Sequence, residues 1–228
     1  MRWDDIGYLL SKNRFSENSL LVDFYTLNHG KCSGIIYGGT SRKLKNYLQL
    51  GNKFSLNFKS KNINKIGYFK IEIIDPISPL FFDEKYKIIS LISSINSIKQ
   101  LTPELLRNKN IFHLFGEFIY KLKKSKDEFI YDYIFWEIDF LSEIGFNLNL
   151  KKYEKINEKN RKHTIKINLD NELIDIPSFL ISRKFNNMDK KMVYYALKFI
   201  GNYIDKKILK PNSLHYSKSR LKLENLYK

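Results

Sequence analysis

The hydrophobic pattern of this chain changes once along its length. From residue 4 to about 75, apolar residues recur at every second position, as in Phe54, Leu56 and Phe58, which alternate with polar neighbours. This is the period of a β-strand with one buried face. The pattern predicts five strands, at about 6–12, 20–25, 31–37, 54–59 and 69–73. Five short strands joined by tight turns predict a small barrel of the OB type.

After Pro76 and Pro79 the period becomes that of helices, which places a domain boundary near residue 80. Helices are expected at about 84–99, 110–124, 130–144 and 189–209, with a further helix start at Thr102 and a strand at 164–169. The predicted fold class is therefore α+β and multidomain. Residues 1–80 form a five-stranded OB-fold β-barrel, and residues 81–228 form an α-helical domain with a polar insertion at about 148–182.

Charge and composition narrow the possible partners. The chain carries 40 Lys and Arg against 24 Asp and Glu, a net charge of +16, and such a field attracts polyanions. No apolar run reaches the about 18 residues of a membrane span, and the N-terminus does not resemble a secretory signal, so we expect a cytoplasmic protein. The one cysteine, Cys32, can form neither an internal disulfide nor a cysteine-based zinc site, and is expected to be buried.

The most informative feature is a stretch without acidic residues. None lies between Asp23 and Glu72, whereas nine basic residues do. They are Lys31, Arg42, Lys43, Lys45, Lys53, Lys59, Lys61, Lys65 and Lys70. The same stretch holds eight aromatic residues: Phe24, Tyr25, Tyr37, Tyr47, Phe54, Phe58, Tyr68 and Phe69. Cations neutralise phosphates and exposed aromatic rings stack on unpaired bases, so the stretch predicts a nucleic-acid-binding domain.

Two interpretations compete for the aromatic residues. The phenylalanines on apolar strand faces, Phe24, Phe54, Phe58 and Phe69, are expected in the barrel core. Tyr37 and Tyr47 lie beside Gly38-Gly39 and a basic run, where core packing and base stacking are equally compatible with the sequence.

Several motifs, in order along the chain, resemble the RecO family. In the N-terminal part they are Asp5-Ile6-Gly7-Tyr8-Leu9-Leu10, Arg14-Phe15-Ser16-Glu17-Asn18-Ser19, Asp23-Phe24-Tyr25-Thr26, Gly30-Lys31 and Gly38-Gly39-Thr40-Ser41-Arg42 before Leu48-Gln49. In the helical part they are Phe135-Trp136-Glu137-Ile138-Asp139-Phe140-Leu141, Glu143-Ile144-Gly145-Phe146 and Ser217-Lys218-Ser219-Arg220.

The resemblance implies an OB fold followed by an α-helical domain, in a DNA repair and recombination mediator. Such a protein binds single- and double-stranded DNA, anneals complementary strands and assists loading of the RecA recombinase. It works with RecR and contacts the C-terminal tail of the single-strand-binding protein. By position, Arg14, Lys31 and the basic loop after Gly39 would face DNA. The complete set of expected DNA-binding residues is Arg14, Lys31, Tyr37, Arg42, Lys43, Lys45, Tyr47, Lys53, Lys59 and Lys61.

The sequence departs from the family pattern in two places. Many relatives carry a cysteine-based zinc module after the Gly-Phe pair, but residues 148–181 contain no cysteine, so we expect no metal and no other cofactor. Relatives also place arginine just ahead of the aromatic-glutamate pair, where this chain has Tyr133-Ile134-Phe135. If that arginine holds the tail of the single-strand-binding protein, other residues must do so here.

We consider two alternative functions besides that of a DNA mediator. An RNA-binding OB-fold adaptor fits the same charge and aromatic pattern, which does not distinguish the sugar. A metal-dependent nuclease would use Glu137, Asp139 and Glu143, but Glu137 and Asp139 diverge on a helix, which favours a solvated or paired face. Because the sequence shows no catalytic constellation, we predict that the protein is not an enzyme.

Overall fold

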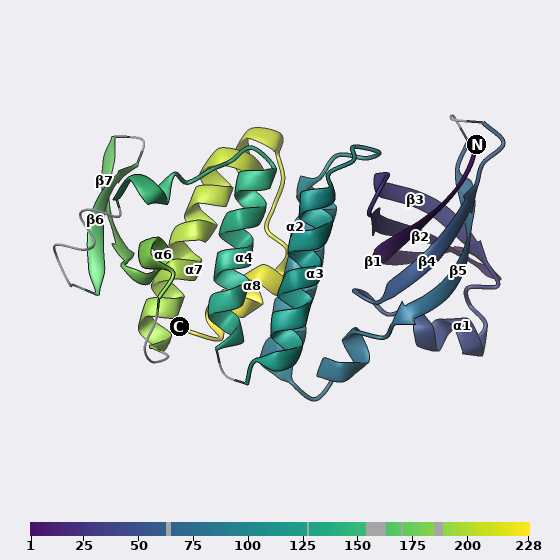
Figure 1. The fold of residues 1–228 in the computed structure, drawn as a ribbon, viewed down its shortest axis with the longest axis horizontal. Helices are drawn as coiled ribbons and strands as arrows, with labels where there is room; N and C mark the ends of the chain where they lie inside the picture. The colour runs from purple at the N-terminus through teal and green to yellow at the C-terminus, as the bar shows by residue number, and fades with distance from the viewer. Residues whose placement is uncertain (63–64, 127, 154–162, 170, 185–188) are drawn as a thin grey trace. The chain divides into compact units, whose positions relative to one another are not determined.

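The computed structural model describes residues 1–62, 65–126, 128–153, 163–169, 171–184 and 189–228. The chain forms two compact units, Met1–Lys123 and Lys124–Lys228. Figure 1 shows strands at the N-terminal end of the first unit, followed by two long helices in the same unit. The strands end at Asp75, close to the predicted change of pattern, while the domain boundary at residue 80 stays a prediction.

The predicted five-stranded barrel is confirmed. Its strands are β1 (Arg2–Ser16), β2 (Ser19–Thr26), β3 (Gly30–Tyr37), β4 (Lys53–Lys59) and β5 (Gly67–Asp75), closed in the order β1-β2-β3-β5-β4. Strand β1 is longer than predicted because it serves two neighbours. Residues 2–8 pair with β4, and residues 7–16 pair with β2 through two register shifts.

The barrel core is aromatic, as the alternation predicts. Phe24, Phe54, Phe58 and Phe69 are all buried inside it. The parallel seam between β3 and β5 has only two register pairs, Gly34↔Gly67 and Ile35↔Tyr68. A Cβ atom on Gly67 would overlap the Phe58 ring, so glycine lets core rings fill the space where the barrel closes.

A short helix and two long helices complete the first unit. Helix α1 (Arg42–Tyr47) interrupts the expected loop between β3 and β4, and the turn η1 (Ser78–Phe81) leads to α2 (Lys85–Leu101) and α3 (Lys109–Lys124). The expected helix start at Thr102 is wrong. Thr102 ends α2, and its hydroxyl donates to the Ile98 carbonyl. A Thr-Pro-Glu run resembles a helix N-terminus, but here the backbone turns away to pair Glu104 with Lys31.

The second unit is mostly helical, with one added hairpin. Its helices are α4 (Phe129–Glu143), α6 (Phe179–Ser182), α7 (Lys190–Ile204) and α8 (Lys218–Asn225), with helical turns η2 (Leu150–Tyr153), η3 (Asp205–Leu209) and η4 (Lys210–Asn212). The predicted strand β6 (Thr164–Leu169) pairs with β7 (Glu172–Pro177), which the sequence pattern did not reveal. Within the described ranges, no helix is long and apolar enough to cross a membrane.

The outer surface of β2 and β3 is closed by the protein itself. The Lys31 ammonium donates to the carbonyls of Lys99 and Thr102, at 2.9 and 2.6 Å, where α2 ends. A Cβ atom on Gly30 would overlap the Leu106 carbonyl oxygen, so the loop after α2 lies directly on the strand. We call the outward residues Asp23, Tyr25, Lys31 and Ser33 the covered face, because residues 99–108 contact each of them.

Replacement of Lys31 by methionine is expected to destabilise the barrel unit. Two carbonyls at the negative end of α2 would lose a charged donor, at a cost of about 1–3 kcal/mol in the free energy of unfolding. Urea denaturation followed by Trp3 fluorescence, in a Trp136→Phe background, measures this change. Lys70→Met, at an exposed position on β5, is the matched control, and an equal effect of both variants would contradict a special role for Lys31.

Candidate nucleic-acid interface

Helix α1 exposes the densest basic sequence of the acid-free stretch. The hydroxyl of Ser41 caps the helix by accepting a hydrogen bond from the Leu44 backbone N–H. Leu44 packs against the barrel core. We call four of the five exposed residues of this helix, its three cations and its tyrosine, the α1 cluster: Arg42, Lys43, Lys45 and Tyr47. The cap and the one apolar anchor thus present three cations to solvent from a fixed backbone.

The β1–β2 hairpin tip lies beside the loop that leads to α1. The Gly38 N–H donates to the Asn18 carbonyl at 2.7 Å, and Ser19 pairs with Tyr37 across β2 and β3. Gly38 has φ +71°, a left-handed conformation that suits glycine and turns the chain out of β3. The predicted residues Arg14 and Tyr37 are therefore brought to the same end of the barrel as the α1 cluster.

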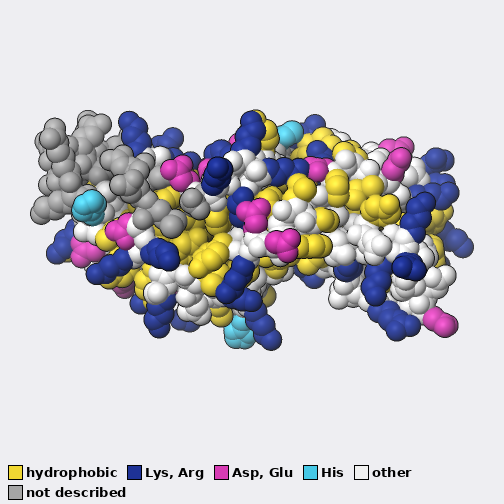
Figure 2. Space-filling model, turned by 90° about the horizontal axis from the view of Figure 1, so that it is seen from below, with side chains coloured by type: hydrophobic (Ala, Val, Ile, Leu, Met, Phe, Trp, Pro, Cys, Tyr) yellow, Lys and Arg dark blue, Asp and Glu magenta, His cyan; other side chains and the backbone are white. Residues whose placement is uncertain are grey.

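The cations at this end have no carboxylate partners among the described residues. Within the described part of the chain, no ion pair involves Arg14, Arg42, Lys43 or Lys45. Burial, and then the neighbouring charge of Lys45, lower the pKa of Lys12, whose ammonium donates to the Leu48 carbonyl. Figure 2 shows dark blue Lys and Arg side chains gathered on the barrel, seen from the side that carries α1. This surface has the sign that attracts a phosphate backbone.

A second group of basic residues lies where β4 ends. Lys59 pairs with Arg2 of β1 on one side and with Tyr68 of β5 on the other, so the three side chains share the outer face. Two like charges directly opposite each other are destabilising unless an anion lies between them. Lys61 and Lys70, two further lysines of the acid-free stretch, are also exposed. The predicted site did not include Arg2, Tyr68 or Lys70. Lys70 could have been included, because it lies in the acid-free stretch.

Two predicted residues lie elsewhere. Lys31 is held by the end of α2, as described above. The ammonium of Lys53 lies over the rings of Tyr8 and Phe112, at 5.6 and 5.5 Å from their centroids, beside α3. The remaining eight predicted residues are on exposed or half-buried surface near the α1 cluster or the end of β4, and the DNA contact of all ten stays a prediction.

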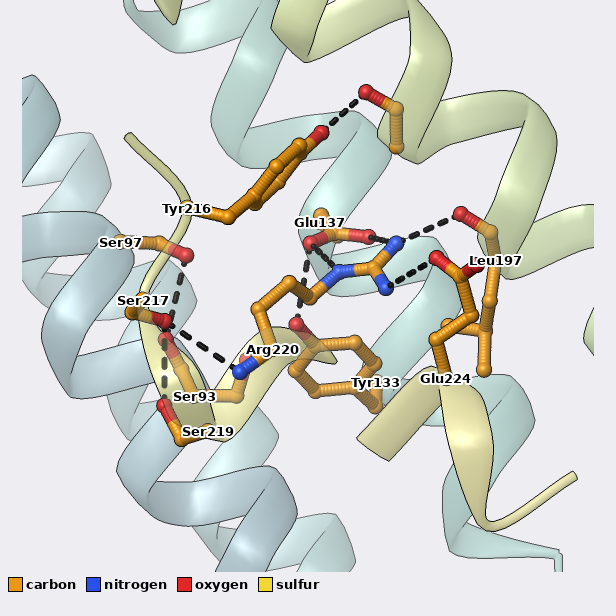
Figure 3. A network of polar contacts seen from close by, with 11 residues as sticks. Ser93, Ser97, Tyr133, Glu137, Leu197, Tyr216, Ser217, Ser219, Arg220 and Glu224 are labelled. Carbon is orange, nitrogen blue, oxygen red and sulfur yellow. Dashed lines mark hydrogen bonds and ion pairs between the residues drawn. The ribbon is translucent and has the colours of Figure 1, made fainter. Parts of the chain in front are cut away.

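The family-like motifs of the helical unit meet in a buried ion pair. Arg220 of α8 donates to Glu137 of α4 at 2.7 and 3.1 Å and to the Leu197 carbonyl of α7 at 2.7 Å. Figure 3 shows its guanidinium reaching between these groups. Burial disfavours the charge of Arg220, but Glu137 and its neighbours outweigh this effect and raise its pKa above the ordinary value. The Ser217-Lys218-Ser219-Arg220 motif therefore joins three helices through its arginine.

Two of the three acidic residues considered for a nuclease, Glu137 and Asp139, are held in ion pairs. Glu137 binds Arg220, and both Asp139 oxygens accept from Arg183, whose guanidinium also lies 5.4 Å from the Phe135 ring centroid. The expectation of a paired face is confirmed for these two residues. Among the residues that the structure describes, no three His, Cys, Asp or Glu side chains gather as metal ligands. Burial raises the pKa of Cys32 to about 12, which suits a core residue rather than a nucleophile.

The chain was compared with known proteins. Residues 1–77 match the family model described as Recombination protein O N terminal. Curated relatives named DNA repair protein RecO include those of Rickettsia typhi, 32% identical over 154 residues, and Rickettsia felis, 31% identical over 152. Each match covers 67% of this chain and 63% of the relative. A Wolbachia pipientis relative is 26% identical over 152 residues, 67% of this chain and 62% of its own length.

The chain spans somewhat less than two thirds of the length of these relatives. Fold and surface define an OB-fold barrel protein with an exposed basic surface and a helical second unit. With the matched family model and relatives, the chain belongs to the RecO family.

Loss of Arg220 is expected to leave Glu137 buried and unpaired. Arg220→Ala should lower the free energy of unfolding of the second unit by about 3–5 kcal/mol, because the cost of an uncompensated buried charge is large. Urea denaturation followed by Trp136 fluorescence, in a Trp3→Phe background, measures it. The double variant Arg220→Met with Glu137→Met removes both charges and should recover most of the loss; equal instability of the single and double variants would contradict this role of the pair.

Proposed function

We propose that this chain is a DNA-binding recombination mediator that anneals complementary single strands and assists RecA loading in recombinational DNA repair. The observation that carries the proposal is the α1 cluster: three cations on one capped helix, without carboxylate partners among the described residues, in a stretch of sequence free of acid. Membership of the RecO family and the printed name of the relatives, DNA repair protein, support the same role.

Annealing needs a protein that holds the backbone and leaves base edges free. Lysine and arginine side chains on a barrel surface contact phosphates, which carry no sequence information, so any two complementary strands could be held. No covalent bond is made or broken in this process, and the protein acts as a binding protein rather than an enzyme. The occupied acidic residues Glu137 and Asp139 agree with this proposal.

The proposed partners follow from the family. They are single- and double-stranded DNA, RecR and the C-terminal tail of the single-strand-binding protein. In the helical unit, the Arg183 guanidinium lies over the ring of Phe135, the residue just ahead of the Trp136-Glu137 pair. Relatives tend to have an arginine of α4 itself just ahead of this pair. A guanidinium from another segment can thus occupy that face of α4. The proposed place of action is the cytoplasm, at the nucleoid during repair.

Single-strand binding is expected to depend strongly on salt and on the α1 cluster. If about six phosphates are neutralised, log affinity should fall with log salt at a slope of about −4. The triple variant Arg42→Glu, Lys43→Glu, Lys45→Glu should make this slope less steep and weaken binding at least about 100-fold at low salt. Each lost phosphate contact means that fewer counterions are released on binding, and this release is what favours the complex. Fluorescence anisotropy of a labelled oligonucleotide between 50 and 200 mM salt, roughly the range in which such contacts dominate, measures both.

The matched control is Lys151→Glu, Lys166→Glu, Lys222→Glu, which changes net charge equally at exposed positions of the second unit. Equal weakening by both triple variants would show a dependence on total charge only and would contradict the assigned surface. Competition between matched DNA and RNA oligonucleotides separates the mediator from an RNA-binding adaptor, because only the latter prefers RNA.

A further inference from the structure

The usual nucleic-acid surface of an OB fold, the outer side of strands 2 and 3, is largely unavailable in this protein. On β3 the outward side chains are Lys31, Ser33, Ile35 and Tyr37. Lys31 and Ser33 contact the segment after α2, and Ile35 is buried. Of these four outward residues only Tyr37, at the end of the strand, is exposed to solvent, at 65% of its surface.

Two tyrosines, which we call the tyrosine pair, lie beside each other at the exposed end of β3. The rings of Tyr37 on β3 and Tyr68 on β5 are 5.9 Å apart between centroids, with planes tilted by 57°. They meet across the seam where these strands pair through only two residues each. A tilted pair of this kind leaves ring faces open, and one of its members is mostly exposed. Open ring faces are what unpaired bases stack on.

Basic residues lie on both sides of the tyrosine pair. On one side, Tyr37 leads directly through Gly38 and Gly39 to the α1 cluster. On the other side, Tyr68 is paired with Lys59, and Lys59 with Arg2. Neighbouring strands are about 4.8 Å apart, so the row from Arg2 to Tyr68 spans about 10 Å.

The nearest carboxylates on the outer face of these strands lie outside this row. Asp4, in the next cross-strand row, accepts a hydrogen bond from the Asn57 amide and lies on the same face as Lys70. Glu72 is one row further, opposite Ser55. Neither forms an ion pair with Arg2, Lys59 or Lys70 among the described residues. The row nearest the tyrosines is therefore purely basic and aromatic.

We propose that an unpaired DNA strand crosses the barrel at the β3–β5 seam, with bases stacked on Tyr37 and Tyr68 and phosphates held by the α1 cluster on one side and by Arg2 and Lys59 on the other. This inference rests on the proposed DNA-binding function and adds the path, the role of Tyr68 and a preference for single strands. A duplex keeps its bases stacked inside, so it can use the cations but not the two rings.

The test uses the full chain with Tyr37→Ala and Tyr68→Ala combined, measured with a single-stranded oligonucleotide and with a duplex of equal length. Loss of stacking should weaken single-strand affinity about fivefold or more, while duplex affinity changes less than about twofold. The conservative double variant Tyr37→Phe with Tyr68→Phe keeps both rings and should restore single-strand binding. Tyr195→Ala, an exposed tyrosine of α7, is the matched control and should have no effect.

Three outcomes are informative. If the alanine pair binds single strands as the wild type does while reversal of the α1 cluster weakens binding, the seam path is wrong and the proposed function stands. If neither set of changes weakens binding, the proposed function fails as well. If Lys31→Met, with the fold intact by circular dichroism, weakens single-strand binding as much as the alanine pair, the strand uses the covered face instead and the seam path is overturned.

Discussion

The contact between Lys31 and the end of α2 determines which parts of the barrel remain available. One ammonium group satisfies two carbonyls at the negative end of a 17-residue helix, and the following residues then pair with β3. This contact fixes the first long helix against the barrel and closes the outer side of β2 and β3. The cations of α1, of the β1–β2 hairpin and of the β4 end lie outside this closed surface and remain exposed or half-buried. The contact of Lys31 with the end of α2 thus leaves only other parts of the barrel surface open to a polyanion.

The strands of the barrel could be predicted from the sequence because their alternation is regular and their core residues are large. Phe54, Leu56 and Phe58 occupy one face, and a shift of one residue would bring all three out of the core. The short helix α1 could not be predicted in the same way. It has six residues, no buried side chain and a stability that depends on the Ser41 cap, so no hydrophobic period marks it.

The candidate site was predictable in composition but not in arrangement. The absence of acid between Asp23 and Glu72 indicated a basic surface, yet it gave Lys31 and Arg42 equal weight. Only tertiary contacts separate them, because the carbonyls that hold Lys31 are about 70 residues away in the sequence, at Lys99 and Thr102. Tyr68 was missed for the same reason, since its neighbour Tyr37 is joined to it by barrel closure rather than by sequence spacing.

In the helical unit, a motif that resembles the family has a structural explanation. Arg220 and Glu137 form a pair whose side chains are only 2% and 1% exposed, which ties the last helix to α4 and α7. Buried pairs of this kind depend on every partner being present, so both ends of the motif must be kept together. The polar surfaces of this unit remain free to differ.

Hydrogen–deuterium exchange with and without a saturating single-stranded oligonucleotide tests the central claim most directly, because it reports on each segment of the barrel at once. The account predicts slower exchange in residues 37–47 and 67–70 on addition of the strand, with residues 30–33 and 99–108 unchanged. Protection confined to residues 30–33 and 99–108, or no protection anywhere in residues 1–80, would contradict it.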